Sequence, residues 1–417
     1  MMKGFAAGAT LLLCPALLWA GFENFNSILI GDRAAGMGGA FTALDDDPAA
    51  CSFYNPATIA RMRGHSLSAT GNLYNKYDVK VGRDNSAEAP LRVNQGSFRP
   101  ISAAAGSIGA FGNFAVGLNI VMPDYEYYSG EIDRSQVGNQ TNNTILQLQD
   151  DSLWVGGNIA LNLDEDRAAG LTVYYTARSY QRTTIDQSST PTTLRSILEE
   201  KTFTHNSLIY MLGYYQKLNT NWSLGTSLRF PSLAVSGRGS YFRSVIDTTG
   251  SPPATTESRE NVPAETRIPL RAAIGLAYSR PKISTYSLDI VYHAPETYRD
   301  FEGTSVSDIY VYRPMINVAI GAEYFLEEWA RLRLGVFTNY ASTQPIPDVQ
   351  NRYTDNINMM GFSANLAIIR SDKISFTFGG YYTGGTGDSI QLINQQLVKK
   401  SKSKQIFSML IGTAYRF

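Results

Sequence analysis

The sequence has little cysteine, little histidine and no excess of charge of either sign. Its 417 residues include 2 cysteines and 3 histidines, and 36 Lys plus Arg balance 36 Asp plus Glu. The balanced charge gives no overall field that would favour a nucleic acid as partner. His65, His205 and His293 lie far apart, without the spacing of metal ligands. We therefore expect no metal, no cofactor and no nucleic-acid partner.

Catalytic motifs are missing as well. A lipase or protease needs a nucleophile placed beside a base, and the sequence contains no Gly-x-Ser-x-Gly elbow to go with its scattered histidines. We therefore expect a protein that is not an enzyme.

The N-terminus has the pattern of a secretory signal. Lys3 is followed by an apolar stretch from Phe5 to Leu18, and Ala20 is a suitable residue before a cleavage site. We predict a signal peptide over residues 1–20. Lipidation at Cys14 is the less favoured alternative, because a leucine directly before the cysteine makes a poor processing site. After cleavage only Cys51 remains, which excludes a fold held by intrachain disulfides.

Apolar and polar residues alternate along much of the remaining chain. Leu332, Leu334 and Val336, for example, alternate with Arg333 and Gly335. Side chains of a strand point to opposite faces in turn, so one face can meet lipid while the other meets a lumen. The uncharged stretch of residues 101–123 also shows this period of two in its second half, which favours a hairpin over a membrane helix.

Counting such segments predicts about fourteen strands. Their approximate ranges are 64–81, 98–108, 114–122, 150–163, 167–182, 202–218, 222–231, 265–279, 284–293, 313–326, 330–341, 357–370, 373–383 and 404–417. An even number suits a closed antiparallel barrel of the bacterial outer membrane, where every backbone polar group must be paired. We predict an all-β, transmembrane antiparallel barrel over residues 64–417.

The predicted links alternate between short and long. The short ones fall at 109–113, 164–166, 219–221, 280–283, 327–329 and 371–372, and the long ones at 82–97, 123–149, 183–201, 232–264, 294–312, 342–356 and 384–403. Outer-membrane barrels combine tight periplasmic turns with long external loops in this way. Tyr125, Tyr127 and Tyr128, in the second long link, suggest an interfacial aromatic girdle rather than a capture site.

Residues 21–63 do not alternate and are rich in small side chains. Glycine permits tight turns, and Asn-Pro begins a turn. We predict that this segment forms a small hatch inside the lumen, with candidate gating residues Gly36, Gly38, Gly39, Asn55, Pro56 and Ala57. The alternatives are simple close packing for the glycines, which is favoured, and a plain turn for Asn-Pro-Ala, which has about even weight.

Three features of this chain resemble a known family. The run Arg-Ala-Ala-Gly-Met-Gly-Gly-Ala at residues 33–40, an acidic patch, and Asn-Pro-Ala at residues 55–57 resemble the FadL-type long-chain fatty-acid transporters of the bacterial outer membrane. Related barrels occur in type IX secretion and in spirochaetes. The resemblance implies a hatch-plugged, fourteen-stranded barrel through which hydrophobic small molecules, above all fatty acids, diffuse passively. Its other partners would be outer-membrane lipid and the barrel-assembly machinery, which would recognise the last strand ending at Phe417.

The predicted register places four arginines in the lumen. Arginine can hold a carboxylate through two hydrogen bonds, but the favoured alternative is pairing with acids such as Glu323 or the hatch aspartates. The candidate lumenal ligand residues are Arg178, Arg229, Arg271, Arg333 and Phe337. A barrel component or adaptor of a protein secretion or surface system, which would bind a protein partner through its external loops, remains the main rival function. An open porin is disfavoured, because a hatch would obstruct its pore.

Overall fold

The computed structural model describes residues 24–25, 27–62, 64–81, 91–97, 101–250, 252–345, 355–371, 373–393 and 396–417. The predicted signal peptide, residues 1–20, lies outside them. So do residues 21–23, 26 and 63 of the predicted hatch, residues 98–100 of a predicted strand, and parts of the predicted links at 82–90, 251, 346–354, 372 and 394–395.

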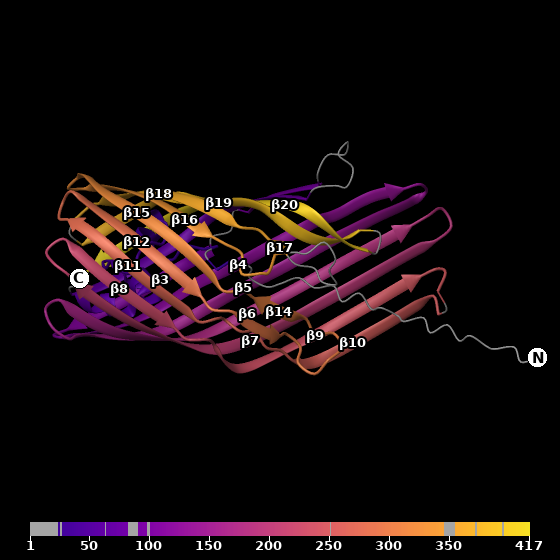
Figure 1. The fold of residues 1–417 in the computed structure, drawn as a ribbon, viewed down its shortest axis with the longest axis horizontal. Helices are drawn as coiled ribbons and strands as arrows, with labels where there is room; N and C mark the ends of the chain where they lie inside the picture. Colours follow the sequence, from indigo (N-terminus) through magenta and orange to yellow (C-terminus); the bar gives the residue numbers. More distant parts are fainter. Residues whose placement is uncertain are drawn as a thin grey trace, which may run out of the picture.

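The described chain forms a closed antiparallel β-barrel of 14 wall strands (Figure 1). β1 closes the wall by pairing with β20, from Ser66 opposite Arg416 to Val81 opposite Lys402. Four wall strands are interrupted, so that β2 and β3, β8 and β9, β10 and β11, and β17 and β18 each form one wall strand in two pieces. This confirms the predicted fold class.

The strand bounds are as follows: β1 (His65–Val81), β2 (Leu91–Ser97), β3 (Ile101–Phe111), β4 (Phe114–Val137), β5 (Gln140–Asn162), β6 (Arg167–Ser189), β7 (Leu194–Lys217), β8 (Trp222–Arg229), β9 (Leu233–Asp247), β10 (Ala254–Pro263), β11 (Arg271–Arg280), β12 (Ser284–His293), β15 (Met315–Glu327), β16 (Ala330–Asn339), β17 (Asp355–Asn356), β18 (Met359–Ile369), β19 (Ile374–Ile393) and β20 (Gln396–Arg416). A separate hairpin, β13 (Glu296–Arg299) and β14 (Ile309–Tyr312), lies between β12 and β15.

The alternation in the sequence becomes an apolar outside and a mixed inside. On β12, for example, Leu288 and Ile290 are exposed on the outer face, whereas Asp289 and His293 are buried on the inner face. Large apolar side chains are exposed on the outside of nearly every wall strand. Such a continuous apolar surface is what contact with lipid requires.

The six predicted short links are present as tight connections at one end, which we call the short-turn end. They are residues 112–113, 163–166, 218–221, 281–283, 328–329 and 370–373, the last of which is described except for residue 372.

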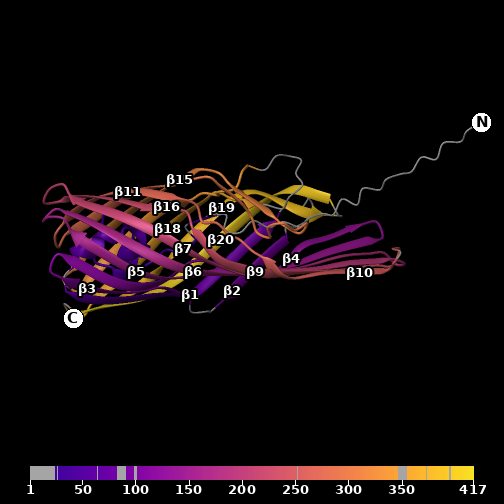
Figure 2. The same ribbon diagram turned by 90° about the horizontal axis from the view of Figure 1, so that it is seen from below.

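The predicted long loops are largely wrong. Most of 123–149, 183–201 and 232–264 is paired strand, because β4 continues to Val137, β5 begins at Gln140, and β9 and β10 form a hairpin. The same holds for the described parts of 384–403. Figures 1 and 2 show β4 to β7, β9 and β10 extending beyond the rest of the wall at the end opposite the short turns, which we call the long-strand end. There the strands have polar side chains on both faces, so their sequence resembles a loop.

The tyrosine girdle is also partly wrong. Tyr128 is buried on the inner side of the wall, in a cluster with Leu146, Leu148 and Tyr180. Tyr125 and Tyr127 alternate with it along β4 and are half-buried.

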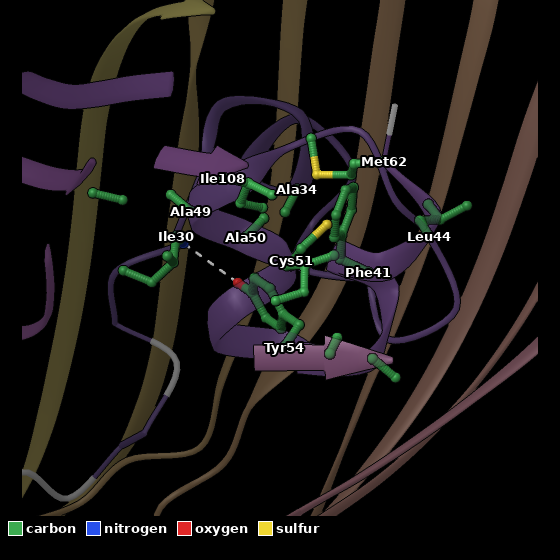
Figure 3. Close-up of a cluster of buried hydrophobic side chains, with 14 of the residues drawn as sticks. Ile30, Ala34, Phe41, Leu44, Ala49, Ala50, Cys51, Tyr54, Met62 and Ile108 are labelled. Atoms are coloured by element: carbon green, nitrogen blue, oxygen red, sulfur yellow. Dashed lines mark hydrogen bonds between the residues drawn. The ribbon is translucent and has the colours of Figure 1, made fainter. Parts of the chain in front are cut away.

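The described residues of 24–62 pack inside the lumen, and we keep the name hatch for this segment. It contains two short helices, α1 (Asp32–Gly36) and α2 (Pro48–Tyr54), and a 3-10 helix, η1 (Pro56–Arg61). Asp47 caps α2 by accepting a hydrogen bond from the Ala50 N–H, and Pro48 occupies the first helical turn. Its core is a close-packed apolar cluster that includes Phe41, Cys51 and Tyr54 (Figure 3). No helix within the described ranges is long and apolar enough to cross a membrane.

Candidate ligand-binding site

A row of three basic side chains crosses the inner wall of the barrel. In the strand register Arg229 of β8 lies directly opposite Arg271 of β11, which lies directly opposite His293 of β12. All three are buried on the lumenal face. We call Arg229, Arg271 and His293 the basic row. Like charges placed opposite each other on neighbouring strands are destabilising, so the arrangement needs an explanation.

The basic row has few hydrogen-bond partners in the protein. Nη1 of Arg271 donates to Oγ of Ser227 at 3.3 Å. Among the described residues, Nε and Nη2 of Arg229 and both ring nitrogens of His293 have no partner. Asp124 attracts the Arg229 guanidinium electrostatically, but Nε and Nη2 of Arg229 donate no hydrogen bond to it. Buried donors without partners cost free energy, and a bound anionic group would satisfy them.

A small cavity of about 30 Å³ lies beside the basic row. Phe25, Phe53, Trp154 and Tyr312 supply its apolar lining, together with Arg229. The Arg229 guanidinium stands 5.5 Å from the centre of the Trp154 ring. A volume of this size holds a few water molecules, so a larger ligand has to displace side chains.

Phe25 is the side chain best placed to be displaced. It comes from the hatch, and its ring stacks on His293 with 4.9 Å between ring centres. It also contacts the edge of Tyr312, which belongs to β14. The cavity thus joins the hatch, the wall and the β13–β14 hairpin, and movement of any of the three changes its size.

The β13–β14 hairpin is fixed over the lumen by buried charges. Nζ of Lys201, on β7, lies 2.5 Å from Oδ2 of Asp300 and 2.7 Å from Oδ2 of Asp308. Tyr298 and Tyr310 stack with 4.8 Å between their ring centres. This part of the structure covers the cavity on the long-strand side.

Two of the predicted lumenal arginines are paired within the protein. Arg178 makes two hydrogen bonds to Asp150, at 2.8 and 2.5 Å. Nε of Arg333 donates to Glu323 at 2.7 Å. Both point into the lumen as the register predicted. Nη1 of Arg333 makes no hydrogen bond among the described residues but lies 3.8 Å from Oδ2 of Asp32, whereas Arg229 has two buried nitrogens without a partner and Arg271 bonds only to Ser227 in the described structure.

Phe337 also points inward without lining a cavity. It is buried in a cluster with the hatch residues Leu29, Ala35 and Ala40, and with Leu410 of the wall. Its place is therefore the contact between hatch and wall, and it does not belong to the ligand pocket suggested by the sequence.

Asn55 ties the hatch to the barrel wall. Its Nδ2 donates to the carbonyl oxygens of Thr42, at 2.7 Å, and of Tyr214 on β7, at 3.0 Å. Its Oδ1 accepts from the Ala57 N–H and so caps η1. Pro56 occupies the first turn of η1, close to Gly170 of the wall. Asn55, Pro56 and Ala57 therefore form the turn that the sequence suggested, and Asn55 in addition bonds the hatch directly to the wall.

The glycines of the hatch allow close packing against the wall and adopt backbone conformations with positive φ. Gly38 and Gly39 have φ values of 69° and 81°, a region that other residues rarely adopt. A Cβ on Gly38 would lie 3.1 Å from the backbone nitrogen of Val336, and one on Gly36 would collide with Asn365. Glycines of the wall also allow the hatch to pack closely against it. A Cβ on Gly225 of β8, for example, would collide with the Thr42 carbonyl of the hatch.

A buried ion-pair network locks α1 to the wall. Glu323 on β15 accepts hydrogen bonds from Nε and Nη2 of Arg33, at 3.2 and 2.8 Å, and from Nε of Arg333. On β12, Asp289 accepts from the N–H groups of Phe41 and Thr42, at 2.9 and 2.8 Å. The hatch is thus held by charged groups in the wall, and opening it requires their rearrangement.

Two ionisable groups inside the hatch are strongly affected by burial. Burial, and secondly the charge of the neighbouring Asp32, raise the pKa of Asp47 to about 7. Burial raises the pKa of the Cys51 thiol to about 12. Asp47 therefore changes charge near neutral pH, whereas Cys51 stays a neutral thiol.

Sequence reasoning missed the third basic residue and the aromatic lining. His293 was judged isolated, because its neighbours in the row are 22 and 64 positions away and meet only through strand pairing. Phe25 and Trp154 carried no distinguishing pattern. Within the part of the chain that the structure describes, no group of His, Cys, Asp and Glu could hold a metal ion.

Comparison with known proteins identifies the fold. No protein-family model and no curated protein sequence matches this sequence. Among solved structures, a Pseudomonas aeruginosa FadL homologue is similar over 94% of this chain and 100% of its own, with a TM-score of 0.71 and 14% identity. The toluene transporter TodX of P. putida (TM-score 0.63, 15% identity, 93% of this chain and 98% of that one) and the toluene transporter TbuX of Ralstonia pickettii (0.61, 14%, 93% and 98%) are similar too. The chain thus has the FadL-type fold that its sequence suggested.

Proposed function

We propose, from this FadL-type fold, that the protein is an outer-membrane channel through which hydrophobic small molecules diffuse passively. We further propose that its substrates are amphiphiles ending in a carboxylate, the class that includes long-chain fatty acids. The continuous apolar outer surface supports a place in a membrane. The short-turn end would then face the periplasm, and the long-strand end the exterior.

The observation that carries the substrate class is the unpaired basic row. A buried guanidinium that lacks hydrogen-bond partners can bind a carboxylate bidentately, because two of its N–H groups point in parallel at the two carboxylate oxygens. The aromatic side chains of Phe25, Phe53 and Trp154 around it would receive the first carbons of an alkyl chain. Together they form a site for a charged head with an apolar tail.

The route through the barrel would follow from the positions of the cavity and the hatch. An amphiphile entering from the long-strand end would displace Phe25 and bind the basic row. The hatch lies between this cavity and the short-turn end, so release would require the Arg33–Glu323 and Asn55 contacts to rearrange. No energy source or cofactor is needed for movement down a gradient.

An uncharged aromatic hydrocarbon is the second candidate substrate. The solved relatives include toluene transporters, and the cavity lining is itself aromatic. The basic row favours the carboxylate, because toluene would leave its donors unsatisfied. The rival role as a protein-binding adaptor loses support, because the loops proposed to bind a partner are largely paired strands.

Binding to the protein in neutral-lipid nanodiscs tests this proposal. We expect oleate to bind saturably and Arg229→Met with Arg271→Met to weaken it at least tenfold, with toluene binding little changed. Arg259→Met, at an exposed arginine of β10, is the control. Equal oleate affinity in the double variant and the wild type would refute the role of the basic row. Absence of binding by oleate and toluene alike would refute the channel function.

A further inference from the structure

A second and larger cavity opens at the short-turn end. It measures about 670 Å³ and lies between the hatch and the wall strands β15, β16, β18, β19 and β20. None of its lining residues lines the cavity beside the basic row. We call it the vestibule. Its size lies within the range usual for small-molecule sites.

The vestibule is amphipathic. Phe325 of β15, Ala367 and Ile369 of β18, and Ala414 of β20 contribute apolar surface. Charged side chains surround this surface, five of them basic and four acidic: Lys282, Arg331, Arg333, Lys373 and Arg416, with Asp32, Asp46, Glu327 and Glu328.

Three of the basic side chains already have acidic partners. Arg333 bonds to Glu323, Arg416 pairs with Asp46 of the hatch, and Lys282 lies 3.9 Å from Glu328. Their charges are therefore largely compensated.

Arg331 is different. Its guanidinium stands 4.5 Å from the centre of the Phe325 ring, and among the described residues its buried Nε has no hydrogen-bond partner. Glu323 attracts the Arg331 guanidinium electrostatically, but it already accepts hydrogen bonds from Arg33 and Arg333. The vestibule thus contains a guanidinium with a buried, unpartnered Nε directly beside apolar surface.

We propose that the vestibule binds the anionic head group of an amphiphile. Arg331 would hold the head group, and Phe325, Ala367 and Ile369 would contact the first carbons of its chain. The site would be the last binding site before a substrate leaves the channel. This role, though not the binding itself, rests on the function proposed above. Two sources share the chemistry: a free carboxylate released past the hatch, and an anionic phospholipid of the adjoining leaflet.

A fluorine reporter at the edge of the vestibule tests the proposal. Ser371 is exposed and lines the cavity, so Ser371→Cys can carry a trifluoromethyl tag, while the buried Cys51 remains unlabelled. The tagged full chain in neutral-lipid nanodiscs is titrated with octanoate and with octanol. A second sample in anionic-lipid nanodiscs, without octanoate, tests the phospholipid source.

The expected result is a saturable shift of the fluorine resonance with octanoate and little shift with octanol. Arg331→Met should weaken the effect at least tenfold, Arg331→Lys should restore part of it, and Arg370→Met, at an exposed arginine outside the cavity, should leave it unchanged. A shift that appears only with anionic lipid would support the site and assign it to phospholipid.

Three outcomes would overturn the inference: no shift with either anion, an equal shift with octanol, or an undiminished shift in Arg331→Met. The double variant Arg229→Met with Arg271→Met separates this test from that of the proposed function. Because neither residue lines the vestibule, its response should persist in this double variant even if lumenal binding is lost.

Discussion

Replacing Glu323 by glutamine should loosen the hatch without unfolding the barrel. Glu323 is fully buried and receives three hydrogen bonds, two from Arg33 of the hatch and one from Arg333 of the wall. Glutamine keeps the shape but removes the negative charge that both guanidinium groups share, and only the more distant Asp32, 3.8 Å from Arg333, and the charge of Asp45 near Arg33 remain. Breaking a buried ion pair by removing one partner costs roughly 3–5 kcal/mol.

We take the lower limit, because the glutamine oxygen still accepts one hydrogen bond. About 3 kcal/mol corresponds to a change of roughly a hundredfold in the equilibrium for opening the hatch. Hydrogen exchange of the α1 and α2 amides, followed by mass spectrometry, should therefore accelerate by about this factor. Exchange in the wall strands far from Glu323 should stay the same.

Glu327→Gln is the matched control, because Glu327 is exposed on the same strand and has no ion pair among the described residues. Unchanged α1 and α2 exchange in Glu323→Gln would refute the idea that this network holds the hatch. Equal acceleration in the control would mean that any loss of negative charge from β15 speeds hatch exchange, so that the buried Glu323 ion pairs have no special role.

Three further predictions concern the hatch. Because the folded state raises the pKa of Asp47 from about 3.8 to about 7, protonated Asp47 stabilises the hatch at low pH, and this stabilisation is lost as the pH rises through 7. Hatch exchange, corrected for its intrinsic pH dependence, should be roughly thirtyfold slower at pH 5.5 than at pH 8, and Asp47→Asn should abolish the difference. Persistence of the difference would exclude Asp47 as its cause. Cys51, buried with a raised pKa, should resist thiol reagents in the wild type and react at least tenfold faster in Glu323→Gln, whereas ready wild-type labelling would contradict its burial. Gly225→Val should displace the hatch at Thr42 and also expose Cys51 to labelling, while Gly157→Val, where the nearest atom to a new Cβ is 4.0 Å away, should not.

The sequence predicted the wall of the barrel well where its two faces differ. On β12 and β16 apolar residues face outward and small or polar residues face inward, and this contrast reveals both strand and register. The short turns were equally visible, because breaks in the alternation coincide with them. Signals of this kind are local and need no knowledge of the partner strand.

The long-strand end was poorly predicted because the same contrast is missing there. Beyond Asp124, β4 carries charged and polar residues on both faces, although it pairs with β5 as far as Val137. A strand that leaves the membrane loses its apolar face but keeps its hydrogen bonds. Alternation alone therefore cannot distinguish it from a loop.

The candidate site depended on register between strands that are distant in sequence. The inward direction of Arg178 and Arg333 followed from alternation, but their partners Asp150 and Glu323 come from other strands. The basic row is invisible until β8, β11 and β12 are aligned. The function of an inward arginine depends on which residues oppose it, and only the fold determines that.

Uptake by liposomes that contain the purified protein is the most direct test of the channel. Fatty acid carrying an intact carboxylate, labelled and supplied outside, should enter saturably, and the double variant Arg229→Met with Arg271→Met should take it up at least tenfold more slowly. A methyl ester of the same chain should be a poor substrate for the wild type. Uptake no faster than by protein-free liposomes would contradict the proposed channel, and equal uptake of acid and ester would contradict the role of the basic row.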